Sequence, residues 1–367
     1  MKLIKTYKFK LKPTKRQGLE FDSIINTCRY IYNVALEERV TAYKMAKKSV
    51  SKYDQYNQLP EIKKEFPWVA EVYSDTIQEV LDRVDKSFQR FFKTKIGYPK
   101  FAKKGFYNSF TFKRHFTVND KDIKLPKIGK VKYFNSRPVK GVPKTATIIK
   151  ELNNYYICIT SEYDVPDITI DKSQAIGIDV GVSKFSYLSD GSYIESPLFL
   201  EPKLRKLKIL NRKLSRQKKG SKERAKTKYK LQKLYLEISN TRKDFLHKTS
   251  TEIANKYSLC IMEDINFQKM KTLNSTLTRR MSDSGFGMFR TFNNYKFKER
   301  SKFFTLVNPA YTSQTCNSCG IVDKNSRLSQ AEFVCTNCGL VTNADLNGAK
   351  NILREGISQI TKRKTLV

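Results

Sequence analysis

The sequence predicts an α+β protein of several modules, in which a β-barrel with inserted helices precedes an α/β domain that carries a small metal-binding insert. Three observations carry this prediction. Alternating apolar and polar residues indicate strands at the N-terminus and over residues 98–170, and segments of helical periodicity separate them. Two short apolar runs, 175–181 and 259–263, have the character of buried strands. Two Cys-x-x-Cys pairs follow in the last 60 residues.

The first 97 residues are expected to form one strand and two helices. Residues 3–12 alternate apolar side chains with lysines and stop at a proline, which predicts a half-buried strand with a basic outer face. Residues 15–48 carry an apolar stripe at helical spacing. A polar stretch with prolines follows, and no helix is expected in it. The second helix begins near a Ser74 or Asp75 cap and ends by Gly97.

Residues 98–170 predict short strands separated by proline and glycine turns. Together with residues 1–12 they are expected to form the barrel, with the helical module 13–97 inserted. Aromatic residues alternate with lysines over 98–107, which suits either a nucleic-acid surface or a basic barrel rim. The predicted strands are marked by Phe110 and Phe112, Ile123 and Leu125, Val131 and Tyr133, Ala146 and Ile148, and Tyr155, Ile157 and Ile159.

The second half begins with a buried strand, 175–181, that contains one acid, Asp179. A hairpin follows, and Asp190-Gly191 supplies its turn. Residues 203–233 hold 15 Lys and Arg against a single acid, Glu223, so a basic helical hairpin is expected over 201–256. A merely solvated helical face would mix both signs of charge. One-signed charge on an amphipathic frame therefore argues for phosphate contacts.

The charge of the whole chain supports that interpretation. Its 367 residues include 71 Lys and Arg and 35 Asp and Glu, which gives a formal net charge of +36. Such an excess repels itself unless a polyanion neutralises it, and nucleic acid is the expected partner. A basic surface that serves only solubility would rarely carry so large an excess.

Cysteine usage and the absence of long apolar runs predict a cytoplasmic protein with no membrane partner. The N-terminus has no apolar signal core, and no apolar run approaches the ~18 residues of a membrane span. The cysteine count is seven, without disulfide-like spacing, which favours a reducing compartment. Cys28, Cys158 and Cys260 lie in apolar runs and are expected to be buried thiols.

Four cysteines near the C-terminus have the spacing of a four-thiolate zinc site, with 15 residues between the two pairs. They are Cys316, Cys319, Cys335 and Cys338. Each pair runs into a glycine, Gly320 or Gly339, which allows a tight turn under the metal. One structural Zn²⁺ is therefore expected in an insert at 308–342. Lys324 and Arg327, on the loop between the pairs, are candidates for contacts to DNA.

Three acids stand out by their setting. Asp179 lies in a buried strand, Glu263 ends another, and Asp345 follows the cysteines at the start of a helical run that Asn343 is suited to cap. A carboxylate at a strand end is most often only a cap or turn residue. Converging carboxylates, by contrast, bind two Mg²⁺ ~4 Å apart and promote phosphodiester cleavage. If the three acids meet, a cation is required, because three desolvated carboxylates repel one another.

Several segments together resemble the TnpB family, transposon-encoded relatives of type V CRISPR effectors. The three acids lie in motifs similar to those of a RuvC-type, RNase H-like nuclease, and the zinc knuckles stand between the second and third motif as in that family. The acidic motifs are Gly177-Ile178-Asp179-Val180-Gly181, Met262-Glu263-Asp264-Ile265-Asn266 and Asp345-Leu346-Asn347-Gly348-Ala349-Lys350-Asn351. Further typical segments are Tyr311-Thr312-Ser313-Gln314-Thr315-Cys316, Arg29-Tyr30-Ile31-Tyr32-Asn33, Gly97-Tyr98-Pro99-Lys100-Phe101 and Arg242-Lys243-Asp244-Phe245-Leu246-His247.

The resemblance implies an RNA-guided DNA endonuclease of an insertion sequence in a prokaryotic cytoplasm, associated with the nucleoid when it is bound to DNA. Its partners would be a guide RNA derived from the transposon end and target double-stranded DNA beside a short recognition motif. Asp179, Glu263 and Asp345 would bind two catalytic Mg²⁺, and the four cysteines one structural Zn²⁺. Gly348 stands where many relatives have alanine, which is expected to loosen the last helix slightly.

The same resemblance implies a division into domains. A wedge-type barrel would comprise 1–12 and 98–170, and a helical recognition module 13–97. A RuvC-like nuclease domain would comprise 171–307 and 343–367, with the zinc ribbon 308–342 inserted. A non-cleaving nucleic-acid-binding regulator of transposition and a nuclease that needs no guide remain alternatives. The oligomeric state is open, with a monomer favoured.

Overall fold

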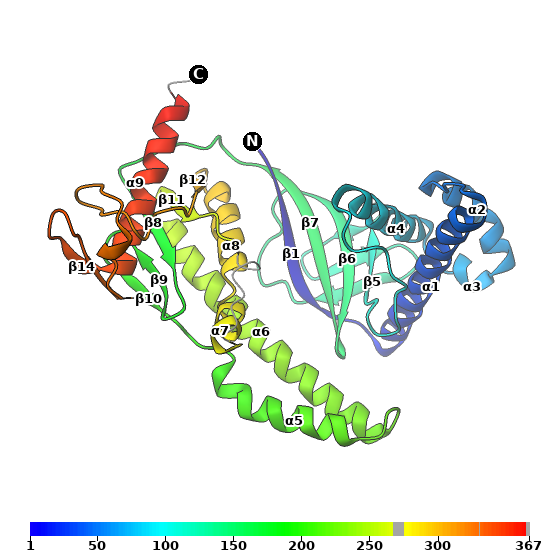
Figure 1. The fold of residues 1–367 in the computed structure, drawn as a ribbon. Coiled ribbons are helices and arrows are strands. Elements are labelled where there is room, and N and C mark those ends of the chain that lie inside the picture. Colours follow the sequence, from blue (N-terminus) through cyan, green and yellow to red (C-terminus); the bar gives the residue numbers. More distant parts are fainter. Residues whose placement is uncertain (267–274, 330, 365–367) are drawn as a thin grey trace. The chain divides into compact units, whose positions relative to one another are not determined.

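The computed structural model describes residues 1–266, 275–329 and 331–364 (Figure 1). The chain divides into two compact units, Lys2–Asp164 and Val165–Val367, and Met1 belongs to the second. Each unit has hydrophobic clusters of its own. None of the helices in the described part of the chain combines the length and apolar character that a membrane crossing needs.

The first unit contains a seven-stranded antiparallel sheet in the order β2-β6-β7-β1-β5-β4-β3. The N-terminal strand pairs with β7 and β5, so it joins the sheet formed later in the chain, as predicted. β2 and β3 stand at the two ends of this order, and closure into a barrel stays a prediction. The strands are β1 (Lys2–Lys12), β2 (Ser109–Phe112), β3 (Thr117–Val118), β4 (Asp122–Leu125), β5 (Gly129–Tyr133), β6 (Val142–Glu151) and β7 (Asn154–Asp164).

The helices of this unit are α1 (Lys15–Ala46), α2 (Lys52–Glu65), α3 (Pro67–Ala70) and α4 (Ser74–Thr94). The sequence prediction missed α2 and α3, which lie in the polar stretch with prolines; Pro60 stands inside α2. A capping box starts α2: the Asp54 N–H donates to Ser51 Oγ at 3.2 Å, and the Ser51 N–H donates to Asp54 Oδ2 at 2.8 Å. Burial of Leu59 then holds the helix against the core of the unit.

The predicted cap of α4 is wrong. Ser74 is the first residue of the helix, and neither Ser74 nor Asp75 caps it. The Asp75 carboxylate accepts a hydrogen bond from the backbone N–H of Lys113 at 2.8 Å, just after β2. Asp75 therefore ties α4 to the sheet, a tertiary contact that local sequence does not reveal.

The second unit contains a five-stranded sheet in the order β10-β9-β8-β11-β12. β8, β11 and β12 run parallel, whereas β9 and β10 form the predicted antiparallel hairpin beside β8. The strands are β8 (Ala175–Val180), β9 (Lys184–Leu188), β10 (Tyr193–Glu195), β11 (Leu259–Glu263) and β12 (Phe303–Val307). A two-stranded ribbon, β13 (Glu332–Val334) and β14 (Val341–Asn343), completes the strands of this unit in the described residues.

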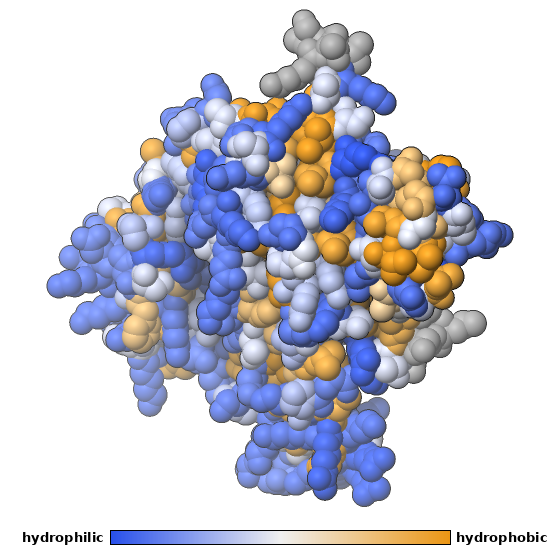
Figure 2. All heavy atoms as spheres, turned by 90° about the vertical axis from the view of Figure 1, so that its left-hand side faces the viewer, coloured by the Kyte–Doolittle hydropathy of each residue, from blue (hydrophilic) through white to orange (hydrophobic). Residues whose placement is uncertain are grey.

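Its helices include the predicted basic hairpin, α5 and α6, which pack on each other through leucines such as Leu207 and Leu231. In Figure 2 hydrophilic residues cover most of the lobe at the lower edge, which corresponds to the lower end of α5 and α6 in Figure 1. The helices are α5 (Leu204–Arg216), α6 (Lys222–Lys256), α7 (Ser275–Ser284), α8 (Phe286–Glu299) and α9 (Ala344–Lys364), with short 3₁₀ turns η1 (Glu201–Lys203) and η2 (Lys324–Ser326).

Candidate metal centres

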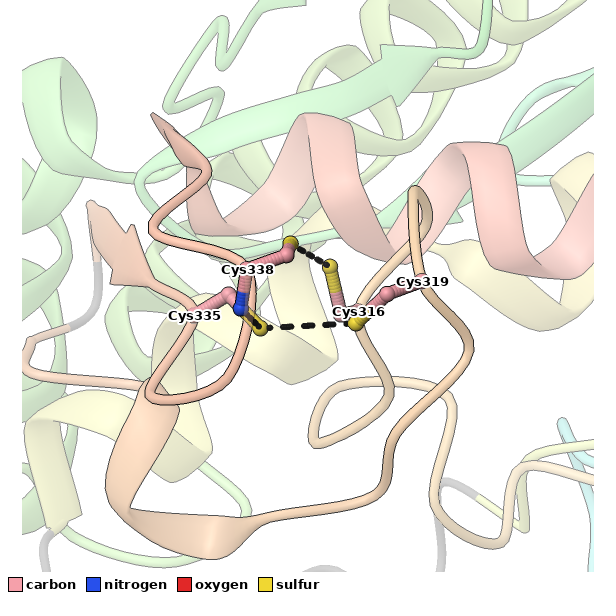
Figure 3. Close-up of side chains that lie close together, drawn as sticks. All are labelled: Cys316, Cys319, Cys335 and Cys338. Carbon is pink, nitrogen blue, oxygen red and sulfur yellow. Dashed lines mark hydrogen bonds between the residues drawn. The ribbon is translucent and has the colours of Figure 1, made fainter.

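The four predicted cysteines meet at one point between two loops of the second unit. Their sulfur atoms all lie within 4.8 Å of one another, and Cys316–Cys338 and Cys319–Cys335 are each separated by 3.6 Å (Figure 3). Four thiolates bound to one zinc at ~2.3 Å lie about 3.8 Å apart, so the spacing fits a tetrahedral site. The cluster is compatible with a structural Zn²⁺.

Two equivalent backbone turns shape this cluster. In the first, the Gly320 N–H donates to Cys316 O at 3.0 Å, and in the second the Gly339 N–H donates to Cys335 O at 3.0 Å. Both glycines have positive φ, +79° and +71°, which favours glycine there.

A hydrogen bond from the backbone N–H of Ile321 lowers the pKa of the Cys319 thiol to about 6. At Cys338, a hydrogen bond from the Leu340 N–H is outweighed by burial and the neighbouring cysteines, which raise its pKa to about 11. Because the thiolate is the form that binds metal, zinc would have to displace the proton of Cys338.

Asp179 and Glu263 lie at the same edge of the five-stranded sheet. Ile178 of β8 and Met262 of β11 are paired in parallel register, and each acid is the next residue along its strand. Because parallel strands end at a common edge, the two carboxylates emerge side by side. The sheet order therefore explains how two acids far apart in the sequence come together.

Asp345 is the second residue of α9, and Asn343 caps this helix as predicted: its Oδ1 accepts from the N–H groups of Asp345 and Leu346 at 3.0 and 3.1 Å. The helix lies directly on β8, since a Cβ added at Gly177 would come within 2.3 Å of the Ala349 carbonyl oxygen. A Cβ at Gly348 would likewise lie 2.8 Å from Asp179 Oδ2. The Asp179 carboxylate thus reaches α9 at Gly348, three residues beyond Asp345 on the same helix face.

The three acids influence each other electrostatically. Burial raises the pKa of Asp179 well above its ordinary value, and the charges of Glu263 and Asp345 raise it further. Burial also raises the pKa of Glu263 and of Asp345. Ionisation of each carboxylate therefore costs free energy at this site, and a bound cation would reduce that cost.

The structure does not bring the three carboxylates as close together as the four sulfurs. Within residues 1–266, 275–329 and 331–364, the cysteines form the one group of three or more Cys, His, Asp or Glu side chains whose ligand atoms all lie within 4.8 Å of one another. A single shared pocket for Asp179, Glu263 and Asp345 stays a prediction. Like charges without a cation between them are expected to stand apart.

Arg327 reaches this acidic group from the zinc ribbon. Its Nη2 donates to Asp345 Oδ1 at 3.1 Å, and its charge lowers the pKa of both Asp345 and Asp179 against the effect of burial. The sequence indicated Arg327 only as a candidate contact to DNA. Its place beside the acids depends on how the ribbon folds back, and nothing local in the sequence signals that.

Thr312 is a second residue whose place was not foreseen. Its hydroxyl donates to Glu263 Oε1, and this bond lowers the pKa of Glu263 against the effect of burial. Thr312 lies in the segment before Cys316 that resembles the family pattern, but no role was assigned to it. The segment that enters the zinc ribbon and the loop between its cysteine pairs therefore each supply one polar contact to a candidate catalytic acid.

These features define a class: an α/β protein with carboxylates at the edge of its sheet and an inserted four-cysteine ribbon. Comparison with known proteins makes the class specific. The chain is 32% identical over 374 residues to the putative RNA-guided DNA endonuclease InsQ of Escherichia coli K12, which covers 97% of this chain and 93% of InsQ. It therefore belongs to the TnpB family, as its motifs predict.

Two more distant relatives agree with this assignment. A putative RNA-guided DNA endonuclease of Streptomyces pristinaespiralis is 27% identical, over 96% of this chain and 90% of the relative. The CRISPR-associated endodeoxyribonuclease Cas12f1 of Sulfoacidibacillus thermotolerans is 26% identical, over 57% of this chain and 52% of the relative.

Three family profiles match separate segments of the chain. Residues 158–274 match a family described as probable transposase, and residues 286–352 match the Cas12f1-like TNB domain, a range that contains the cysteine cluster. Residues 1–48 match a profile described as a helix-turn-helix domain. The structure has a strand and one long helix there, β1 and α1, rather than two helices joined by a turn.

Proposed function

We propose that this protein is an RNA-guided endonuclease that cleaves double-stranded DNA beside a short recognition motif, with the reaction centred on Asp179, Glu263 and Asp345. One observation carries the proposal: the Asp179 carboxylate lies against α9 at Gly348, three residues from Asp345, at the sheet edge where Glu263 also ends. Membership of a family whose relatives are named RNA-guided DNA endonucleases supports it.

The donor set suits Mg²⁺. Three carboxylates supply oxygen ligands, and burial that raises their pKa values leaves them in need of positive charge. Two bound Mg²⁺ would supply an activated water and stabilisation of the leaving oxygen in phosphodiester hydrolysis. Asp179 and Glu263 hold their oxygens at the sheet edge, and Asp345 closes the group from the helix.

Arg327 has a role of its own in this proposal. Its cationic guanidinium already lies in contact with Asp345. A phosphate brought to the acids would meet this cation at the same place. Arg327 therefore offsets the repulsion between substrate and carboxylates and helps to orient the phosphate.

The nucleic-acid partners are a guide RNA derived from the transposon end and the target DNA duplex. The hairpin α5–α6 offers a dense set of Lys and Arg for phosphate contacts, with Glu223 the single acid over residues 203–233. Affinity carried by such contacts falls steeply with salt, because bound counterions are released. We take the acting species to be a monomer with one guide.

The finer division of the fold is part of the same proposal. The first unit comprises a wedge-type barrel, 1–12 and 98–170, with the recognition helices at 13–97. The nuclease domain, 171–307 and 343–367, is RNase H-like, and the zinc ribbon 308–342 is inserted in it. The three parallel strands flanked by an antiparallel hairpin support this assignment.

The decisive experiment is guided cleavage. The protein is co-expressed with RNA transcribed from the adjoining transposon end, and the complex is incubated with Mg²⁺ and duplexes that carry a matching target beside a randomised flank. We expect cutting only of matched DNA with a defined flank. Asp179→Ala should bind DNA normally and cut slower by about 10²- to 10³-fold or more.

The matched control is Asp264→Ala. Asp264 follows Glu263 directly, but its exposed carboxylate pairs with Arg290 at 2.8 Å on the surface. This variant should cut like the wild type. Equal cutting by Asp179→Ala would remove the assignment of the site. Binding without any cutting by the wild type would favour a regulator of transposition, and cutting of unrelated DNA without RNA would favour a nuclease that needs no guide.

A further inference from the structure

Two asparagines of α9 tie the entry of the zinc ribbon to the helix that carries Asp345. Asn347 and Asn351 are four residues apart, so they share one face of α9. Both are buried, with 0% and 3% of their surface exposed. Buried amides are retained where they are hydrogen-bonded, because an unpaired one is costly. Their partners therefore show what this face of the helix is built to hold.

Asn347 holds the first zinc knuckle. Its Oδ1 accepts from the backbone N–H of Asn317 at 2.9 Å and from Asn317 Nδ2 at 2.7 Å, and its Nδ2 donates to the Thr315 carbonyl at 2.8 Å. Asn317 stands between the two cysteines of the first pair. The knuckle is thus attached to α9 by three hydrogen bonds from one side chain.

Asn351 holds the turn just before that knuckle. Its Nδ2 donates to the carbonyl oxygens of Thr312 and Thr315 at 2.9 and 2.6 Å. Its Oδ1 is buried and has no hydrogen-bond partner among the described residues. Retaining an amide that is only half satisfied indicates that its two donated bonds matter.

The turn at residues 311–315, which precedes the first cysteine pair, contains a backbone conformation that its residue type disfavours. Tyr311 has a φ of +65°, a region that bulky residues rarely adopt, at a cost of ~1–2 kcal/mol. Its carbonyl oxygen accepts from the N–H groups of Gln314 and Thr315, both at 3.0 Å, and from Thr315 Oγ1 at 2.8 Å. Surrounding contacts therefore hold the turn in a strained shape, as is common near functional sites.

The strained turn directs Thr312 at Glu263. The Thr312 side chain is largely buried, its hydroxyl donates to Glu263 Oε1, and its carbonyl is held by Asn351. Thr312 is therefore held on one side by Asn351 of α9, the helix that carries Asp345, and on the other side by Glu263 at the end of β11. Zinc knuckle, turn, helix and acid form one continuous set of contacts.

We propose that Thr312 is a positioning residue that orients the Glu263 carboxylate for divalent metal, and that Asn347 and Asn351 make its position depend on the folded zinc knuckle. This inference rests on the proposed function, because it concerns the same acids. A zinc ion held by the four cysteines would then bear on the reaction only indirectly, by stabilising the knuckle and turn that place Thr312 against Glu263.

The test measures Mn²⁺ binding to the zinc-loaded, full-length protein by titration calorimetry, with Mn²⁺ standing in for Mg²⁺ at oxygen ligands. Thr312→Val keeps the shape of the side chain but removes the hydroxyl, and we expect about tenfold weaker binding. Thr312→Ser restores the hydroxyl and should recover most of the affinity. Zinc content and melting temperature should match the wild type in both variants.

A second pair of variants tests the link to the helix. Asn351→Ala should weaken Mn²⁺ binding in the same direction as Thr312→Val, and the double variant should lose less than the sum of the two. Lys350→Ala changes the exposed neighbour on α9 and should have no effect. In guided cleavage, Thr312→Val should raise the Mg²⁺ concentration at half-maximal rate and leave DNA affinity unchanged.

Each outcome decides something. Wild-type Mn²⁺ affinity in Thr312→Val, failure of serine to rescue, or full additivity with Asn351→Ala overturns the positioning role while guided cleavage by the wild type stands. A second outcome rejects both the inference and the proposed function. In it, the wild type binds no more Mn²⁺ than Asp179→Asn does, and the wild type cuts no matched DNA.

Discussion

The two candidate metal centres of the second unit differ in how far the polypeptide assembles them by itself. The four sulfurs already lie within 4.8 Å of one another, whereas the three carboxylates do not meet that limit. The sulfurs stand on two short turns whose backbone hydrogen bonds fix them, such as Cys316 N–H to Ile321 O and Cys335 N–H to Leu340 O, both at 2.9 Å. The acids stand at the ends of three different elements and repel each other.

This difference is the one expected between a structural metal site, the four cysteines, and a proposed catalytic site, the three acids. A closed thiolate site stabilises the structure around it and leaves no position for substrate. The acidic site instead holds charge that the protein alone does not neutralise, since Arg327 is the one basic side chain that the structure pairs with Asp345 among the described residues. Under the proposed function, divalent cations from solution would supply the remaining positive charge.

The largest expected effect comes from breaking the thiolate centre. Cys335→Ser should abolish zinc binding and unfold residues 308–342, because zinc binding at such sites supplies ~10–16 kcal/mol of folding free energy. Guided cleavage should disappear as a consequence, since Thr312 and Arg327 lose their places. Zinc content by atomic emission and new proteolytic cuts within 308–342 are the measurements.

Cys158→Ser is the matched control, because Cys158 lies on β7 in the other unit and outside the cluster. It should keep zinc and cleavage. A Cys335→Ser protein that kept full thermal stability without zinc would show that the ribbon folds without metal, and the contrast between the two centres would be lost.

A smaller and opposite effect is expected at the acids. The pKa of Asp179 is raised in the folded state, so its contribution to stability is present below the unfolded-state value and is lost as pH rises through the folded-state value. At neutral pH without divalent metal, Asp179→Asn should therefore stabilise the protein. A gain of ~1 kcal/mol would raise the melting temperature by about 2–4 °C in a unit of this size.

Added Mg²⁺ should reverse that order. The wild type gains stability by binding the ion, and the Asp179→Asn variant does not. Without Mg²⁺, lowering the pH toward the acidic range should narrow the difference between the two proteins, because the wild-type carboxyl becomes neutral. Asp264→Asn, at an exposed acid, should change neither curve. A melting temperature of Asp179→Asn below that of the wild type in metal-free buffer would contradict the inference that the ionised Asp179 carboxylate destabilises the metal-free protein.

The sequence predicted most elements of both units because their patterns are local. Alternation marked β1, β6 and β7, and two acids at the ends of apolar runs turned out to share one sheet edge. The miss at α2 has a local cause as well: the segment is polar and contains prolines, but the capping box of Ser51 and Asp54 starts a helix that tolerates Pro60 inside it.

The rest of the site could not be predicted, since it depends on contacts between segments distant in the chain. Thr312 donates to Glu263, and Asn351, 39 residues later, holds the Thr312 carbonyl. Arg327 reaches Asp345 only because the ribbon folds back over the start of α9. Hydroxyl and guanidinium groups occur throughout this basic chain, and nothing in the local sequence sets these two apart.

The smallest expected effect comes from changing the contact between Asp179 and α9 at Gly348. Gly348→Ala adds a Cβ that would lie 2.8 Å from Asp179 Oδ2, so the carboxylate must turn away. Alanine also favours the helix by up to ~1 kcal/mol, so we expect metal-free stability to change by less than ~1 kcal/mol. The Mg²⁺ needed for half-maximal cleavage should rise a few-fold. Gly287→Ala is the control, because its added Cβ would meet nothing within 4 Å on α8. If Gly348→Ala leaves the Mg²⁺ requirement unchanged, the Asp179 carboxylate has room to serve the metal from another orientation, and the acidic centre is less tightly defined by α9 than the thiolate centre is by its turns.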